Sequence, residues 1–546
     1  MIKNINLNKD AVIEKLQSEK FDLLIIGGGI TGAGIALDAA ARGLKTALIE
    51  KKDFAYGTSS RSTKLIHGGL RYLKQLEFGL VKEVGSERAV VHKLAPHLVI
   101  PEKMLLPLYE KRGMGSMLTS IGLKLYDWLA GVKREDQRKM LTRKQTLKQE
   151  PLLNSQDVKG GAIYAEYRTD DARLTIEIIK AAIAHGATVN NYCEVTDFIY
   201  LDGTVTGVVG RCNLTENSFV IQSKVVVNAA GPWVDLLREK DKSKSGKHLH
   251  LTKGVHIVVP REKLPVTQSI YFDVGDGRMI FAIPRGRITY IGTTDTDYSG
   301  DLDNVFAGKQ DAEYLIKAVN LTFTNFNLSL NDIESSWAGL RPLIHEEGKG
   351  ASELSRKDEI FESASGLISI AGGKLTGYRK MAERVVDLVV DRSFDERELK
   401  SCLTGSILLA SSDFKSYIDV RSYQQTISEK LKKHELQHHV GELVSNFGKQ
   451  CDDILGRFEM VDENDKEVRL VKAQLDYCIK MEMIKTGSDF FVRRTGLLYF
   501  DLPLLKKVLD PCLRTMATQF NWSDAKLNEE KNEIKRLIDQ ALNFKI

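Results

Sequence analysis

The chain has 546 residues, of which 42% are hydrophobic and 28% are charged. This length exceeds one hydrophobic core, so about two or three domains are expected, and the composition argues against a disordered or integral membrane protein. Basic residues exceed acidic ones by only 5, which does not predict nucleic-acid binding. The 6 cysteines form no C-x-x-C pair, so no thiolate metal site or disulfide framework is expected, and a reducing cytoplasm fits the chain.

Residues 22 to 50 have the pattern of a strand, a glycine turn, a helix and a second strand. Gly27, Gly29 and Gly32 form a G-x-G-x-x-G motif after the first strand, and Glu50 closes the second. Glycines at this spacing let the backbone approach a pyrophosphate at a helix N-terminus, and an acidic residue in the position of Glu50 accepts hydrogen bonds from a ribose. The pattern predicts a dinucleotide site without deciding between NAD and FAD.

A second stretch, residues 57 to 72, concentrates hydroxyl groups, glycines and cations. Small hydroxyl side chains could bind ribitol and phosphate oxygens, and glycines would let the backbone lie against a flat ring. A solvated loop is the alternative interpretation of this composition. The candidate cofactor ligands here are Thr58, Ser59, Ser60, His67 and Gly68.

Short β-rich runs broken by Gly and Asn turns extend from about residue 160 to 375 and indicate an interleaved α+β part. Within them, the strand 225–228 ends in the small residues Ala230 and Gly231, which could adjoin a cofactor. The strand 367–371 ends in Gly372 and Gly373 and leads through Leu375 and Thr376 into a helix. A helix N-terminus at that point would stabilise negative charge developing on a reduced flavin.

After about residue 400 the chain is rich in Lys and Glu at helical spacing, which predicts a helical domain. This part contains His434-Glu435-Leu436-Gln437-His438, the H-E-x-x-H pattern of zinc hydrolases. On a helix both histidines would share a face, but no third ligand is evident in this Lys-rich stretch. We therefore predict no metal site.

Six motifs in fixed order carry a resemblance to one family: SSRSTKLIHGGLRYL, VNAAGPW, KGVHIVVP, IGTTDTDY, GLRPL and AGGKLTGYRK. The chain resembles the FAD-dependent (aerobic, respiratory) glycerol-3-phosphate dehydrogenase family from near residue 20 to 380. The resemblance implies FAD as the cofactor and a combined α/β plus α+β fold. Its parts are a Rossmann-like FAD domain of the glycine-oxidase-like kind (about 20–75, 160–250 and 350–395), an interleaved substrate domain (about 76–160 and 250–350) and a helical C-terminal domain (396–546).

The resemblance also implies a set of substrate ligands. The motif residues Arg71, Tyr72, Arg341 and Lys374 are expected to bind the phosphate of glycerol 3-phosphate, with Arg356 as a fourth cation. Forked guanidinium donors with a lysine suit a phosphate dianion. The implied reaction is oxidation of sn-glycerol 3-phosphate to dihydroxyacetone phosphate by hydride transfer to FAD.

Oxidation of an alcohol needs a base near the hydroxyl group. His256 and His67 are the two candidates, because imidazole titrates near neutral pH. We favour His256, since His67 lies among residues expected to contact the cofactor. Thr293 and Thr294 could position the substrate hydroxyl or the ring.

The electron acceptor is expected to be a membrane quinone. The stretch between GLRPL and AGGKL is short, whereas related oxidases that use O2 carry an insertion there. Residues 117–131 are apolar and precede a basic flank, which suits peripheral contact with anionic lipid on the cytoplasmic face, although a core helix explains them equally well.

Three other functions compete with this interpretation: an NAD enzyme, a flavin amine or amino-acid oxidase, and a non-enzymatic nucleotide-binding protein. For the helical domain three roles stay open: a packing cap, a contact in a homodimer or a regulatory surface.

Overall fold

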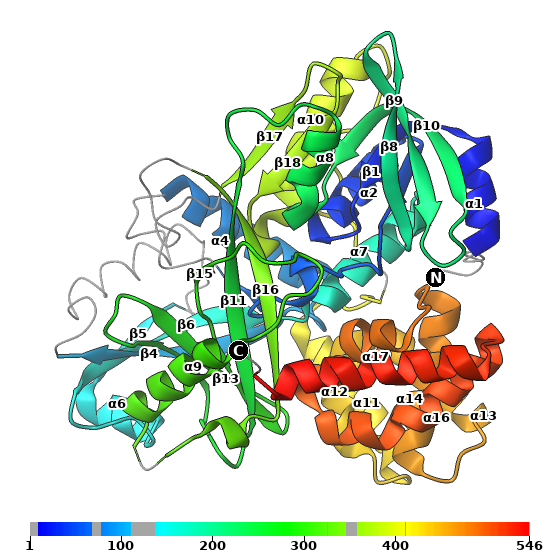
Figure 1. Cartoon of the computed structure of the whole chain (residues 1–546). Coiled ribbons are helices and arrows are strands. Elements are labelled where there is room, and N and C mark those ends of the chain that lie inside the picture. Colours follow the sequence, from blue (N-terminus) through cyan, green and yellow to red (C-terminus); the bar gives the residue numbers. More distant parts are fainter. Residues whose placement is uncertain are drawn as a thin grey trace.

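The computed structural model describes residues 9–67, 78–110, 137–324, 326–345, 357–409 and 411–544. In these ranges the chain forms two sheets and a helical domain (Figure 1). Blue, green and yellow-green segments mix within the upper part of the view, so residues distant in the chain lie side by side there. The chain passes between the two sheets several times, as the interleaved fold predicts, and the fold class is confirmed. The predicted domain limits stay a prediction.

The first sheet has the order β17-β18-β10-β1-β2-β7, with β9 beside β10 and β8 beside β9. Its pairs β18/β10, β10/β1, β1/β2 and β2/β7 are parallel. Parallel strands are apolar runs because both faces of the sheet are covered. The strands are β1 (Lys20–Ile26), β2 (Thr46–Ile49), β7 (Thr188–Asn190), β8 (Cys193–Leu201), β9 (Thr204–Cys212), β10 (Ser218–Asn228), β17 (Asp358–Glu362) and β18 (Ile368–Gly372).

Three packed helices cover one face of this sheet: α2 (Ile30–Arg42), α7 (Asp171–Ala184) and α10 (Tyr378–Ser393). Helix α1 (Lys9–Ser18) contacts β7 and β10, and α8 (Val234–Lys240) follows β10. Because β1, β2, β10 and β18 run in the same direction, their carboxyl ends meet at one edge. Ligands of open parallel sheets bind at this edge.

The second sheet has the order β15-β11-β14-β13-β12-β4-β6-β3, with β16 beside β11 and β5 beside β6. Helices α6 (Arg143–Gln149) and α9 (Lys309–Thr322) contact β6 and β11 of this sheet, whereas α4 (Phe78–Leu94) packs against the core of the first sheet. The strands are β3 (Leu65–Ile66), β4 (Ile100–Tyr109), β5 (Lys139–Thr142), β6 (Val158–Arg168), β11 (Leu249–Pro260), β12 (Ser269–Asp273), β13 (Met279–Arg285), β14 (Ile288–Gly292), β15 (Thr296–Asp297) and β16 (Ser335–Ile344).

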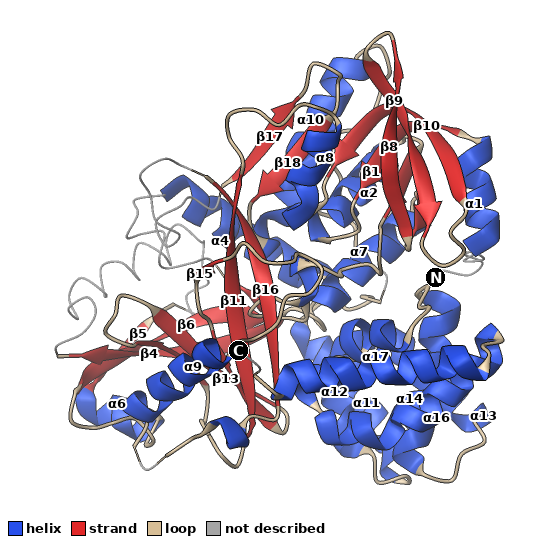
Figure 2. Cartoon of the chain, viewed as in Figure 1, coloured by secondary structure: helices blue, strands red, loops and turns tan. Residues whose placement is uncertain are grey.

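The C-terminal part is helical, as predicted (Figure 2). It comprises α11 (Tyr417–Lys432), α12 (Val440–Phe447), α13 (Cys451–Met460), α14 (Lys466–Met481), a π-helix (Asp489–Arg494), α15 (Leu497–Phe500), α16 (Leu502–Phe520) and α17 (Asp524–Leu542). Side chains cap several of these helices; Asp465, for example, accepts from the backbone of Val468 at the start of α14. The domain docks on β16, where Ser335 Oγ donates to Leu498 O at 2.7 Å.

The H-E-x-x-H pattern does not lie on one helix. Helix α11 ends at Lys432, Glu435 has a φ of 63°, and Gln437–His439 form a separate 3-10 turn. The two histidines therefore do not share a helical face. His438 and His439 instead both approach Glu467 Oε1, at 3.3 and 3.2 Å.

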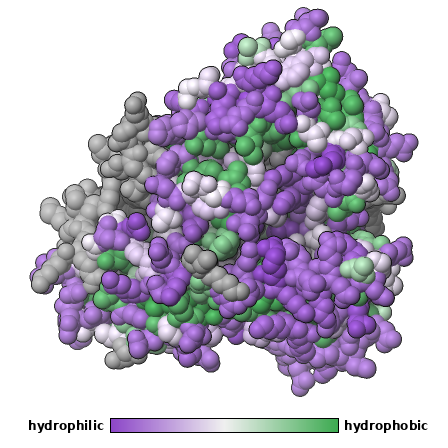
Figure 3. All heavy atoms as spheres, viewed as in Figure 1, coloured by the Kyte–Doolittle hydropathy of each residue, from purple (hydrophilic) through white to green (hydrophobic). Residues whose placement is uncertain are grey.

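The visible face of the helical domain is mainly hydrophilic (Figure 3). Among the described residues, no helix combines the length and the apolar character needed to cross a membrane.

Candidate active site

A cavity of about 600 Å³ lies between the two sheets. Its walls include the carboxyl ends of β1, β2, β10 and β18 and inward-facing residues of β11 and β16. The three glycine-bearing stretches of the sequence therefore converge on one cavity.

The glycine turn after β1 is shaped by contacts that exclude side chains. Gly27 has a φ of 115°, and a Cβ there would lie 2.5 Å from Ala229 O. A Cβ on Gly32 would lie 1.9 Å from Gly27 O, so helix α2 packs directly under the turn. Glu50 Oε2 accepts a hydrogen bond from Gly28 N at 2.7 Å, which fixes the acidic residue beside the turn.

The hydroxyl-rich stretch folds back onto the glycine turn. Ser59 Oγ accepts from Ile30 N at 2.9 Å at the start of α2. Thr58 Oγ1 donates to Leu340 O at 2.7 Å and so links the first sheet to β16. Thr58 and Ser59 border the cavity, whereas Ser60 is buried behind it.

The third stretch closes the cavity from the side of β18. Gly372 and Gly373 have φ values of 79° and 78°, which favour glycine, and they carry the chain to Lys374. A short 3-10 helix (Leu375–Gly377) follows and continues into α10. Thr376 Oγ1 donates to His67 O at 3.4 Å, which brings this stretch against the hydroxyl-rich one.

His256 lies on β11 between two cross-strand neighbours. Its ring stacks on Trp337 of β16 at a centroid distance of 4.7 Å and an angle of 11°. On the other side, a Cβ on Gly292 would lie 2.1 Å from His256 Cδ2, so only glycine leaves room for the imidazole. Nε2 lies 3.0 Å from Thr63 Oγ1, and the buried Nδ1 has no hydrogen-bond partner among the described residues.

Burial, together with the positive charges of Arg341 and Lys64, lowers the pKa of His256 well below its ordinary value of 6.5. The imidazole is therefore neutral at neutral pH and can accept a proton.

Arg341 on β16 is held by three oxygen atoms. Its Nη1 donates to Asp295 Oδ1 at 2.9 Å, and its Nη2 donates to Thr293 Oγ1 at 2.9 Å and to Thr294 O at 3.1 Å. A Cβ on Gly254 would lie 2.2 Å from Nη2, so this glycine makes space for the guanidinium group. The arrangement fixes a partly exposed cation at the cavity wall.

Comparison with known proteins identifies the family of this chain. The family described as FAD dependent oxidoreductase matches residues 22–379, and the C-terminal domain of alpha-glycerophosphate oxidase matches residues 402–527. Aerobic glycerol-3-phosphate dehydrogenase of Bacillus subtilis is 47% identical over 98% of both chains. The chain belongs to the aerobic glycerol-3-phosphate dehydrogenase family.

Solved structures extend the comparison. Glycerol-3-phosphate dehydrogenase from Bacillus halodurans, complexed with FAD, is 44% identical with a TM-score of 0.84 and covers 98% of each chain. Glycine oxidase from Bacillus cereus is 22% identical, with a TM-score of 0.51 over 68% of this chain and 98% of its own, and shows that the fold is shared. The expected glycine-oxidase-like fold and the FAD dependence of the family are thus confirmed.

The cavity of this glycerol-3-phosphate dehydrogenase family member fits FAD. Glycines at positions 27 and 32 leave a cradle that a Cβ would fill, and Gly29, Ile30 and Thr31 at the N-terminus of α2 border the cavity, where a pyrophosphate is stabilised. Glu50 adjoins this turn and would bind a ribose, while the glycines at the end of β18 and the 3-10 helix would let a flat ring approach the backbone.

Most site residues predicted from the sequence border this cavity. They are Gly27, Gly29, Glu50, Thr58, Ser59, His67, Ala230, Gly231, His256, Arg341, Gly372, Gly373, Lys374, Leu375 and Thr376. Gly32 and Ser60 lie behind the lining, and Thr293 contacts Arg341 instead of the cavity. Gly68, Arg71, Tyr72 and Arg356, like residues 117–131, lie outside the described residues. The assigned roles stay predictions.

Three residues that shape the site were not predicted from the sequence. Thr63 contacts His256, Trp337 stacks on it, and Gly254 admits Arg341. Alternation along a strand could have placed Gly254 on the same face as His256. No local signal reveals that Trp337 is the cross-strand partner of His256.

The buried neutral histidines predict that acid destabilises the fold. Burial and the charges of Arg173 and Lys180 lower the pKa of His97 to about 3, and His256 is lowered in the same direction. Both imidazoles take up protons near pH 6.5 only in the unfolded chain, so stability present above pH 6.5 is lost as the pH falls below it. Each contributes up to about 1.4 kcal/mol per pH unit.

Urea unfolding between about pH 7 and pH 5.5 measures this loss. The free energy of unfolding should depend less steeply on pH in His97→Gln than in the wild type. An equal pH dependence in the two proteins would show that His97 is protonated to the same extent in the folded and unfolded chain.

Proposed function

We propose that the protein oxidises sn-glycerol 3-phosphate to dihydroxyacetone phosphate with FAD as the cofactor. The observation that carries the proposal is a neutral buried imidazole and a fixed guanidinium on the wall of the same cavity as the dinucleotide turn. Full-length relatives named for this activity support it.

In this reaction the substrate hydroxyl replaces Thr63 Oγ1 as the partner of His256 Nε2, and Nε2 takes its proton. Stacking on Trp337 fixes the plane of the ring throughout, while Thr63 holds Nε2 before the substrate binds. Bound FAD supplies the acceptor for the hydride that leaves carbon 2. The enclosing sheets limit access of water to these groups.

Arg341 and Lys374 bind the phosphate group in our proposal, with Arg71, Tyr72 and Arg356 as further candidates. Arg341→Ala should raise KM for glycerol 3-phosphate about 10- to 150-fold, because a hydrogen bond to a charged group contributes about 1.5–3 kcal/mol. The rate of flavin reduction at saturating substrate should fall much less.

Steady-state kinetics over a wide substrate range test this expectation. Arg287→Ala is the matched control, because Arg287 is paired with Glu334 away from the cavity and its loss should leave KM unchanged. A KM for Arg341→Ala within a factor of about two of the wild type would remove Arg341 from the phosphate site.

Anaerobic titration of the yellow enzyme tests the reaction itself. We expect glycerol 3-phosphate to bleach the flavin absorption with one equivalent per flavin, and glycine or L-proline to leave it unchanged. Bleaching by an amino acid but not by glycerol 3-phosphate would instead identify an amino-acid oxidase, the alternative that shares this fold.

We further propose a membrane quinone as the electron acceptor, with peripheral contact between the protein and an anionic membrane surface. The stretch between GLRPL and AGGKL is short, whereas related oxidases carry an insertion there, and this supports the quinone acceptor. The apolar residues 117–131 and the basic flank that follows them support the membrane contact. Mixing the reduced enzyme separately with a quinone analogue and with O2 distinguishes the acceptors. Faster reoxidation by O2 would identify a glycerol-3-phosphate oxidase.

A further inference from the structure

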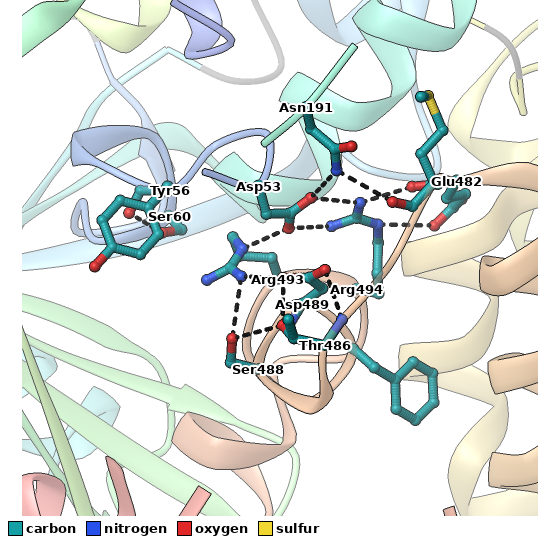
Figure 4. A network of polar contacts seen from close by, with 12 residues as sticks. Asp53, Tyr56, Ser60, Asn191, Glu482, Thr486, Ser488, Asp489, Arg493 and Arg494 are labelled. Atoms are coloured by element: carbon teal, nitrogen blue, oxygen red, sulfur yellow. Dashed lines mark hydrogen bonds and ion pairs between the residues drawn. The ribbon is translucent and has the colours of Figure 1, made fainter. Parts of the chain in front are cut away.

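A buried cluster of charges joins the helical domain to the loop that follows β2 (Figure 4). The loop side contributes Asp53, three residues after Glu50. The helical domain contributes Glu482, Asp489, Arg493 and Arg494. Asp53, Asp489 and Arg494 are each 0% exposed, so water does not screen their interactions.

Both carboxylate oxygens of Asp53 are bound by guanidinium groups. Arg494 Nη1 donates to Oδ2 at 2.8 Å, and Arg494 Nη2 donates to Oδ1 at 3.0 Å. Arg493 Nε donates to Oδ2 at 2.6 Å. Burial alone would raise the pKa of Asp53, but the two arginines outweigh it and lower the pKa, so the carboxylate is ionised.

The backbone of the helical domain is adapted to this contact. Arg493 and Arg494 are consecutive residues at the end of a π-helix (Asp489–Arg494), and both reach one carboxylate. Further hydrogen bonds fix each arginine. Asp489 Oδ1 accepts from Arg493 Nη2 at 2.7 Å, and Glu482 O accepts from Arg494 Nη2 at 2.7 Å. Single-turn π-helices inside helical structure are frequent at functional sites.

Asp53 in turn lies next to the residues that pack on the glycine turn. Phe54 follows it, and a Cβ on Gly28 would lie 2.7 Å from Phe54 Cδ1. Ala55 N donates to Gly28 O at 3.0 Å, while Gly28 N donates to Glu50 Oε2. Both backbone groups of Gly28 are therefore bound by the loop that carries Asp53.

A second contact connects Arg493 to the cavity wall. The guanidinium of Arg493 lies 5.6 Å from the ring centre of Tyr56, which borders the cavity. Asn191 also joins the two parts, since its Nδ2 donates to Asp53 Oδ1 at 3.2 Å and to Met483 O at 3.1 Å. The helical domain thus holds the loop 50–57 from its outer side.

We propose that Arg493 and Arg494 are positioning residues of the FAD site, and that the helical domain fixes the dinucleotide turn through Asp53. This role rests on the FAD dependence of the family and is independent of the identity of the substrate. A bidentate arginine gives the orientation that such a role requires, whereas a lysine would supply only a point charge.

FAD affinity of the holoenzyme tests the proposal without using activity. The enzyme is diluted serially, and the FAD that passes an ultrafilter gives the dissociation constant. Arg494→Met, which leaves Asp53 paired with Arg493, should raise this constant about tenfold, as expected for coupling through packed side chains. Arg494→Lys should raise it less.

Arg285→Met is the matched control. Arg285 is also a buried cation that joins the helical domain to a sheet, but its partners are Glu442 and Asp170 and not Asp53. Circular dichroism should show that both Met variants lower the unfolding temperature, while only Arg494→Met weakens FAD binding. Wild-type FAD affinity in Arg494→Met, or an equal loss in Arg285→Met, would overturn the proposal. If Arg494→Met does not fold, the comparison of Arg494→Lys with Arg285→Met decides in the same way.

Discussion

His256→Ala is expected to slow the reduction of the flavin by glycerol 3-phosphate about 100- to 10,000-fold, the usual contribution of a positioned general base. The effect should appear in the rate and not in substrate affinity, because Arg341 and Lys374, the proposed phosphate ligands, are unchanged. The physical reason is that burial and nearby cations keep the imidazole neutral. Anaerobic stopped-flow absorbance at saturating substrate measures the rate directly.

His67→Ala is the informative comparison for this prediction. His67 borders the same cavity, and its ring lies edge-on to Phe281 with 6.1 Å between the ring centres. If His67→Ala abolishes reduction while His256→Ala retains the wild-type rate, the base has been assigned to the wrong histidine. A large loss in His256→Ala together with a small one in His67→Ala supports the assignment.

Gly32→Ala is expected to weaken FAD binding strongly although Gly32 does not border the cavity. The added Cβ would lie 1.9 Å from Gly27 O, and a backbone atom cannot move aside as a flexible side chain can. Overpacking of this kind costs about 1–3 kcal/mol. If only the FAD-bound form of the turn is strained, this cost lowers the affinity for FAD about 5- to 150-fold. Ultrafiltration of diluted holoenzyme measures the change.

Gly456→Ala provides the control for the loss of a glycine. Gly456 lies in helix α13, and a Cβ there meets no atom within 4 Å. Alanine should raise helix stability and leave FAD affinity unchanged. Unchanged FAD affinity in Gly32→Ala would mean that α2 can shift away from the turn without disturbing the site.

Local patterns predicted which turns line one end of the cavity, for a physical reason. The turn at Gly27 and Gly29, the acidic Glu50 and the turn at Gly372 all stand at the carboxyl ends of parallel strands, so identifying each strand also located the residues at its end. The convergence of these ends follows from the parallel order of the sheet and needs no information about side-chain packing.

The surroundings of His256 and Asp53 could not be predicted in this way. Thr63 is 193 positions away from His256 in the chain, and Arg493 is 440 positions away from Asp53. Such contacts depend on how the sheets and the helical domain dock, which no local period encodes. The H-E-x-x-H pattern shows the converse: its spacing has meaning only on a continuous helix, and α11 ends at Lys432.

The central claim is that one cavity holds the phosphate at Arg341 and Lys374 and the reacting hydroxyl at His256. A crystal structure of the holoenzyme with glycerol 3-phosphate bound tests it most directly. We predict that the hydroxyl on carbon 2 lies about 2.6–3.2 Å from His256 Nε2 while the phosphate contacts the two cations. A phosphate bound elsewhere, with the hydroxyl out of reach of His256, would contradict the account.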